Sequence, residues 1–247
     1  MTGRTVADEE YVSIWMRPDA PTRRGPGPRR GLSRADIVTA AVRIADEEGL
    51  ERMSMRHIAA ALGTGVMTLY HYVPNRDDLI ELMVDHVAAE VELPERPSGD
   101  WRADLTATAH QRRALWLRHP WLATRTPGHP IWGPNTLRQQ EFVLATLDGF
   151  GLSVDELLSV VGLFSGYVEG FIRNEVGWAE EARRTKVDMQ EWIRRSEPYA
   201  RHLTESGKYP MFNRILAETA TLRLEADTRF RFGLERVLDS IAAAVER

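Results

Sequence analysis

The sequence of 247 residues contains no cysteine. Disulfide bonds, thiolate nucleophiles and thiolate metal sites are therefore excluded, which fits a reducing compartment and removes several classes of enzyme. The sequence also has no run of eighteen apolar residues, and no charged start followed by an apolar stretch. We therefore expect neither a membrane span nor a signal peptide, and we expect a cytoplasmic protein.

Catalytic and metal-binding motifs are missing as well. His110, His119 and His129 are separated by nine and ten residues, which matches neither the HExxH pattern nor another recurrent ligand spacing. Glycine-rich phosphate loops are also absent from the sequence. We expect no catalytic residue, no metal and no cofactor, and an enzyme is disfavoured.

The sequence lacks the alternating pattern of strands and has no repeat of fixed period, so the expected fold class is all-α. Ser33 and Asp36 form a capping box for a helix that Gly49 ends. Asn75 and Asp78 mark a similar start for a helix over 75–93, stopped before Pro94. Further helices are expected at 100–118, 134–149, 153–178, 185–203, 209–222 and 226–246.

Residues 54–76, SMRHIAAALGTGVMTLYHYVPNR, have the spacing of a helix-turn-helix. Ser54 is a good N-cap, and Gly63 allows a tight turn between two short helices. The second helix starts near Gly65 or Val66 and cannot continue past Pro74. This arrangement is the one that places a helix in the major groove of DNA.

Charge is distributed unevenly along the chain. Residues 17–34 carry six arginines against the single acidic residue Asp19, a net charge of +5 within a chain whose total is −4. Proline and glycine prevent a helix here, and residues 6–16 form at most a short helix. We predict a flexible basic arm over 1–31, which is either a solvated linker or a segment whose arginines, Arg29 and Arg30 among them, enter the minor groove.

The chain resembles the tetracycline-repressor (TetR) family of bacterial transcription regulators. The matching residues run from about Leu32 to Val84, with TLYHYVPNRDDLIELM at 68–83 the most specific part. FRFGLERVLDSIAA at 230–243 resembles the last helix of the family's ligand-binding half. The resemblance implies a three-helix DNA-binding domain over 32–76, and a helical bundle over 77–247 that binds a ligand and dimerises, with 75–93 as the linking helix.

The resemblance also implies roles in DNA binding. Arg56, Thr68 and Tyr72 stand where the family reads base edges, because arginine can bind guanine and the threonine methyl can contact thymine. The residues expected to hold phosphates are Tyr70, Arg76, Ser54 and Thr64. Met67 and His71 fit either role.

The helix that Ser153 and Glu156 open is apolar over more than half of its circumference, which predicts burial on two sides. In the family, this helix and the last helix pair with their copies in a second subunit as a four-helix bundle. We therefore predict a homodimer, although an intramolecular core accounts for much of the same pattern. The predicted interface residues are Gly162, Gly166, Gly170, Leu234, Leu238, Ile241 and Val245.

A ligand pocket is expected among the helices at 100–118, 134–149 and 153–178, where family members bind effectors. The aromatic residues suit an apolar or aromatic small molecule, although each of them alone fits a packed core equally well. The predicted walls are Trp116, Phe142, Phe164, Tyr167, Phe171 and Trp178, and the predicted polar groups are His119, Glu141 and Asn174.

Taken with the resemblance, the sequence predicts a regulator, most simply a repressor, that binds double-stranded operator DNA and no membrane. A small-molecule effector would move the linking helix and change the spacing of the two recognition helices. The alternative is a small-molecule-binding protein or enzyme with a vestigial DNA-binding head.

Overall fold

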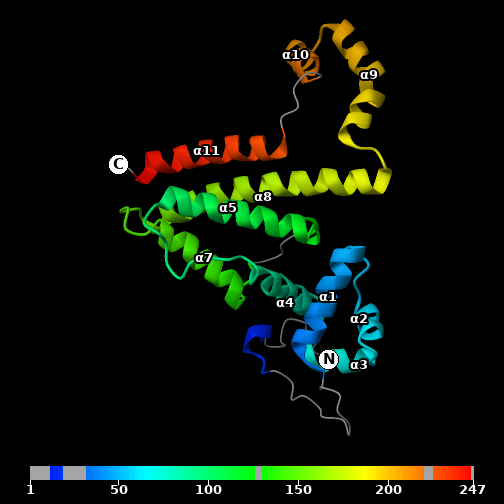
Figure 1. Ribbon diagram of the computed structural model, residues 1–247, viewed down its shortest axis with the longest axis vertical. Helices are drawn as coiled ribbons and strands as arrows, with labels where there is room; N and C mark the ends of the chain where they lie inside the picture. The colour runs from blue at the N-terminus through cyan, green and yellow to red at the C-terminus, as the bar shows by residue number, and fades with distance from the viewer. Residues whose placement is uncertain (1–11, 19–31, 126–129, 220–224, 246–247) are drawn as a thin grey trace, which may run out of the picture. The chain divides into compact units, whose positions relative to one another are not determined.

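The computed structural model describes residues 12–18, 32–125, 130–219 and 225–245 (Figure 1). Within these ranges the chain forms helices and connecting segments without a strand, so the predicted all-α class is confirmed. The elements are η1 (Ile14–Met16), α1 (Arg34–Glu48), α2 (Met55–Ala61), α3 (Val66–Tyr72), α4 (Arg76–Ala88), α5 (Trp101–Arg118), α6 (Trp121–Thr124), α7 (Pro134–Thr146), α8 (Val154–Thr185), α9 (Met189–Ser206), α10 (Pro210–Thr219) and α11 (Ala226–Val245). None of the helices in the described part is long and apolar enough to cross a membrane.

The chain packs into two compact units. One comprises Met1–Leu93 with Arg118–Phe142, and the other comprises Pro94–Leu117 with Val143–Arg247. We call them the head and the body. The division differs from the predicted domains, because α4 and the segment after α5 pack with the helix-turn-helix instead of with the long helices.

The head is built around α1. Ser33 and Asp36 form the predicted capping box, and Gly49 ends the helix with a φ of +88°. Ile37, Ile58 and Leu69 come from three different helices and are completely buried in one core. Burial of such a side chain contributes roughly 1.5–3 kcal/mol, so a few residues account for much of the stability of a domain this small.

Helix α4 is shorter than the predicted range of 75–93. It ends at Ala88, where the amides of Ala89, Glu90 and Val91 each bond the carbonyl three residues earlier and tighten the chain into a last turn. Gln139 of α7 donates to the Ala88 carbonyl at 2.8 Å. A side chain distant in sequence thus satisfies the end of α4, which the local pattern could not indicate.

Residues 12–18 of the N-terminal segment are packed against the rest of the head. Ile14 is completely buried, and the indole nitrogen of Trp15 donates to a carboxylate oxygen of Glu81 at 3.2 Å. A side chain at Gly133 would collide with the Trp15 ring, so glycine permits this close packing. The predicted arm over 1–31 is therefore corrected for residues 12–18, while Arg29 and Arg30 lie outside the described residues.

In the body, α8 and α11 pack along each other, and both lie beside α5 (Figure 1). Phe164, Val168 and Ile172 of α8 and Phe230 of α11 are completely buried. The predicted capping box of Ser153 and Glu156 opens α8, but the helix continues to Thr185 rather than ending near 178. Ion pairs from Arg183 to Glu180 and from Arg184 to Glu181 line this extension.

Candidate functional site

The turn between α2 and α3 has the geometry of a helix-turn-helix. The Ser54 hydroxyl accepts a hydrogen bond from the His57 amide at 3.2 Å and caps α2. Gly63 has a φ of +64°, a left-handed conformation that glycine adopts without steric cost. The Thr64 amide then bonds the Ala59 carbonyl at 3.0 Å, which turns the chain directly into α3.

Helix α3 has an inner and an outer face. Leu69 is completely buried, whereas Met67 is 74% exposed and Tyr70 is 41% exposed. His71 is also exposed, and Thr64 and Thr68 are half-buried. A side chain must project from the protein to reach a base edge, so the outer face of α3 is the candidate DNA-reading surface.

Tyr72 requires a correction. Its exposure is only 7%, because it lies three residues after Leu69 and faces the same core. Its carbonyl oxygen accepts a hydrogen bond from Arg34 at 3.3 Å. Tyr72 therefore positions α3 against α1, and its side chain is not available to a base pair.

Two arginines beside α3 differ in how the protein holds them. Arg56, at the start of α2, is exposed. Arg76, at the start of α4, is also exposed, but its guanidinium donates to the Leu50 carbonyl at 3.0 Å. The bond fixes the direction of the Arg76 side chain while leaving further donors for a phosphate.

The nine predicted effector residues belong to different units. Trp116, Phe164, Tyr167, Phe171, Asn174 and Trp178 lie in the body, and His119, Glu141 and Phe142 lie in the head. Phe164 and Phe142 are buried, while Glu141, Asn174 and Trp178 are exposed. Trp116, Tyr167 and Phe171 are half-buried and remain the best candidates for the walls of an effector site.

His119 is a structural residue of the head. Its Nδ1 lies 2.8 Å from an oxygen of Asp46, and its Nε2 lies 3.1 Å from an oxygen of Glu90. The same Asp46 oxygen accepts a hydrogen bond from the Trp121 indole at 2.8 Å. Both ring nitrogens are thus engaged by carboxylates from α1 and from the end of α4, which corrects the prediction that His119 orients a ligand.

The predicted interface residues also divide into two groups. Leu234, Leu238, Ile241 and Val245 are buried within the chain itself, so these four belong to the intramolecular core rather than to an interface. Gly162 and Gly166 are exposed and Gly170 is half-buried, and a side chain at any of the three would meet nothing within 4 Å. Leu158 and Leu163 of the same helix are 56% and 48% exposed, which leaves an apolar surface on α8 open.

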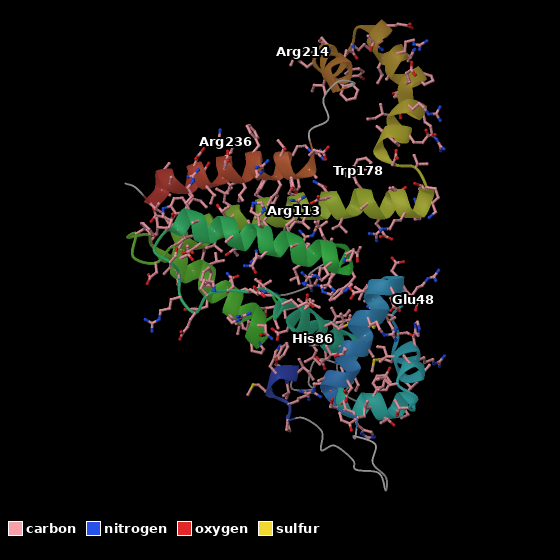
Figure 2. All side chains as sticks on the ribbon, viewed as in Figure 1. Glu48, His86, Arg113, Trp178, Arg214 and Arg236 are labelled. Carbon is pink, nitrogen blue, oxygen red and sulfur yellow. The ribbon has the colours of Figure 1, made fainter. Side chains whose placement is uncertain are left out.

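Two adjacent arginines of α5 were not singled out from the sequence. Arg113 is labelled in Figure 2. It makes two hydrogen bonds of 2.7 Å to Glu175 and one of 2.5 Å to Asp227. The hydrogen bond to Glu175 is the main cause that raises the pKa of Arg113 above its ordinary value. Arg112 has only a 4.0 Å contact with Glu169, and burial lowers its pKa. Two consecutive residues of a helix point in different directions, so Arg112 and Arg113 have different surroundings. The pair of adjacent arginines was the signal in the sequence that could have identified them.

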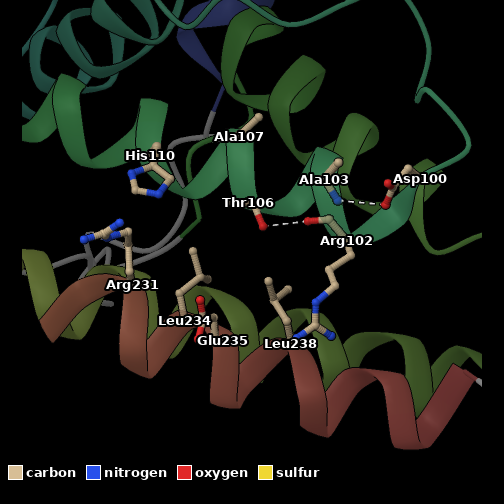
Figure 3. A pocket seen from close by; sticks show the side chains of 10 residues that line it. All are labelled: Asp100, Arg102, Ala103, Thr106, Ala107, His110, Arg231, Leu234, Glu235 and Leu238. Carbon is tan, nitrogen blue, oxygen red and sulfur yellow. Dashed lines mark hydrogen bonds between the residues drawn. The ribbon is translucent and has the colours of Figure 1, made fainter. Parts of the chain in front are cut away.

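The body also contains a pocket, which lies between α5 and α11 and has a volume of about 510 Å³ (Figure 3). It is lined by Asp100, Arg102, Ala103, Thr106, Ala107, His110, Arg231, Leu234, Glu235 and Leu238. The lining contains none of the nine predicted effector residues, and it includes Leu234 and Leu238 from the predicted interface set.

Comparison with known proteins gives matches over both units. The family described as bacterial regulatory proteins, tetR family, matches residues 37–83, and the tetracyclin repressor-like C-terminal domain matches residues 93–245. The HTH-type transcriptional repressor DrrR1 of Streptomyces coeruleorubidus is 40% identical over 233 residues, which cover 94% of this chain and 84% of that protein. An HTH-type transcriptional regulator of Saccharopolyspora erythraea is 33% identical over 80% of this chain and 82% of that protein.

Solved structures are similar as well. The Streptomyces coelicolor TetR family protein ActR in complex with (S)-DNPA has a TM-score of 0.71 and 28% identity, over 87% of this chain and 98% of that chain. ActR in complex with actinorhodin has a TM-score of 0.68, also at 28% identity, over 87% of this chain and 99% of that chain.

Proposed function

The chain belongs to the TetR family of bacterial transcriptional regulators, and we propose that it is a repressor that holds operator DNA as a homodimer until a small molecule binds to its body. It is a DNA-binding protein of a regulatory family, and its similar relatives are named as repressors or regulators. The specific contacts, the effector and the assembly are the parts that we propose.

The outer face of α3 is the observation that carries the proposal. Tyr70 and Met67 project from one face of α3, and Leu69 on the opposite face is buried in the core of the head. We propose that this face enters the major groove, with Thr68 against bases and the Tyr70 hydroxyl on a phosphate. Arg56 is proposed to bind a guanine edge, and Arg76 is proposed to bind the backbone.

The effector is proposed to bind in the body beside Trp116, Tyr167 and Phe171. These rings are half-buried, and the Tyr167 and Phe171 centroids are 6.1 Å apart. The related ActR has been solved with actinorhodin and with (S)-DNPA, which supports a small-molecule effector for this chain. An apolar or aromatic compound suits such walls.

The homodimer is proposed to form through the open face of α8. Gly162 and Gly166 allow another backbone to approach closely, and Leu158 and Leu163 flank them with apolar area. Phe232 of α11 is 64% exposed, and we propose that it adds apolar area from the second helix. Two symmetric copies of such a surface make a four-helix arrangement that closes on itself.

The test is binding to the DNA upstream of the protein's own gene, measured by fluorescence anisotropy against a scrambled fragment of equal length and composition. We expect tight binding to the upstream fragment only, and Tyr70→Ala should weaken it at least tenfold. Tyr199→Ala is the matched control, because Tyr199 is 66% exposed on α9 and has no proposed contact with DNA. Equal binding of both fragments by the unmutated protein would favour a vestigial head.

Release is tested by adding actinorhodin, the ligand known for ActR, and aromatic compounds of similar size to the protein–DNA complex. Phe171→Ala should reduce the sensitivity of the complex to an active compound without changing the affinity for DNA. Phe212→Ala serves as the control, because Phe212 is 49% exposed on α10. A complex that dissociates equally in Phe171→Ala and in the unmutated protein would contradict the proposed location.

A further inference from the structure

The pocket between α5 and α11 has the size and the lining of a small-molecule site. Its volume of about 510 Å³ lies within the range of roughly 300–1,000 Å³ that is typical of ligand sites. Ala103 and Ala107 line it from α5, and Leu234 and Leu238 line it from α11 (Figure 3). Thr106 and Glu235 lie among these residues, so the pocket combines apolar area with polar groups along its length.

Three of the four charged residues that line the pocket have a polar partner within the protein. Asp100 accepts a hydrogen bond from the Ala103 amide at 3.0 Å at the start of α5. Arg102 binds Asp239, and its position lowers the pKa of that carboxyl group through the hydrogen bond. Glu235 lies 3.9 Å from the guanidinium of Arg236.

Arg231 is the exception. It lines the pocket, yet it makes neither a hydrogen bond nor an ion pair with another residue in the part of the chain that the structure describes. Asp227, one turn earlier on α11, bonds Arg113 at 2.5 Å and also interacts electrostatically with Arg231. The hydrogen-bond donors of the Arg231 guanidinium therefore remain available for a ligand in the pocket.

His110 lies at the same end of the pocket as Arg231, and Arg102 lies at the other end (Figure 3). The imidazole ring of His110 packs edge-on against Phe230, with ring centroids 5.3 Å apart. Burial lowers the pKa of His110, and the nearby Arg113 lowers it further, so both effects favour the neutral imidazole. A neutral imidazole offers one hydrogen-bond donor and one acceptor beside the guanidinium.

We propose that this pocket binds an organic anion with an apolar body, its carboxylate or sulfonate on Arg231 and His110 and its apolar part between Ala107, Leu234 and Leu238. Guanidinium is the side chain best suited to a planar or tetrahedral oxyanion, because it donates two parallel hydrogen bonds. The site goes beyond the proposed repressor function, since the predicted effector walls are elsewhere on α5 and α8.

The test uses two fluorescent probes that share an apolar body. 8-Anilinonaphthalene-1-sulfonate carries an anionic group, and N-phenyl-1-naphthylamine lacks it. We expect Arg231→Gln to weaken binding of the sulfonate at least tenfold and to leave binding of the neutral probe unchanged. Arg229→Gln is the matched control, because Arg229 is an exposed arginine of α11 that does not line the pocket.

A second variant blocks the space instead of removing the charge. Ala107 is exposed and lines the pocket, so Ala107→Trp should fill it without disturbing the core and should weaken binding of both probes at this site. Unchanged sulfonate binding in Arg231→Gln, or unchanged binding of both probes in Ala107→Trp, would overturn the assignment. The measurement contains no DNA, so its failure is distinguishable from a failure of the repressor function.

Discussion

Arg113→Met should lower the free energy of unfolding by about 3 kcal/mol, the lower end of what is measured when a buried ion pair loses one partner. The side chain of Arg113 is 9% exposed and that of its partner Glu175 is 17% exposed. Methionine fills the space of the aliphatic stem but leaves the Glu175 carboxylate buried without its two hydrogen bonds. Asp227 is 74% exposed, so water replaces Arg113 there and this carboxylate contributes little to the loss.

The assay is thermal and urea unfolding followed by circular dichroism at 222 nm. For a chain of this length, about 3 kcal/mol corresponds to a decrease in Tm of roughly 6–12 °C. The double variant Arg113→Met with Glu175→Met should recover most of the loss, because an apolar pair of similar volume replaces the ion pair.

Arg112→Met is the matched control on the neighbouring residue. Arg112 has a single contact of 4.0 Å with Glu169 and no hydrogen bond within the described part of the chain, so its replacement should be neutral or slightly stabilising. Equal losses in Arg112→Met and Arg113→Met, or a loss below about 1 kcal/mol in Arg113→Met, would refute the reasoning from burial and partner geometry.

Three further outcomes are expected. Arg56→Ala should cost about 1–3 kcal/mol of operator affinity in anisotropy measurements and spare random DNA, whereas Arg76→Ala should weaken both; equal losses on both DNAs in Arg56→Ala would contradict base reading. The pKa of His110 is lower in the folded than in the unfolded protein, so the unfolded state binds a proton more readily. Stability should therefore fall as the pH drops below about 6.5. His110→Gln should flatten that decrease in thermal melts measured at a series of pH values. Leu163→Asp should shift the sedimentation of a dimer toward the monomer without unfolding it, whereas Leu137→Asp, at similar exposure on α7, should not; a monomer before mutation would exclude the proposed dimer.

The parts of the fold that were predictable rest on local signals. The capping boxes of Ser33 with Asp36 and of Ser153 with Glu156 place the starts of α1 and α8 at the predicted residues. Each box is formed by residues three apart, so the chemistry that starts the helix is visible in the sequence itself. The all-helical class follows from the same kind of periodic pattern.

The errors come from partners that are distant in sequence. His119 is a structural residue because it pairs with Asp46, which lies 73 positions earlier in the sequence. Helical periodicity contains no information about such a distant pairing. Leu238 belongs to an apolar stripe that a helix needs both in an intramolecular core and in a dimer interface. The sequence pattern therefore could not distinguish between the two. Tyr72 shares this ambiguity, since an amphipathic tyrosine fits both a core and a DNA surface.

The site was only partly predictable for the same reason. The outer face of α3 follows from helical spacing once Leu69 is placed inside, and Met67 and Tyr70 are exposed accordingly. The pocket beside Arg231 depends on how α11 lies against α5, which a sequence of amphipathic helices leaves open.

The start of α7 carries a consequence for how motion within the head can be observed. Asp85 of α4 is 4% exposed, and one of its oxygens accepts hydrogen bonds from the amides of Asn135 and Thr136 at 2.8 and 2.9 Å. The first amides of a helix normally lack an intrahelical partner and exchange their hydrogens with water quickly. At Asn135 and Thr136 a carboxylate from another helix accepts these amides and slows their exchange, so the two amides report on the separation of α4 from α7.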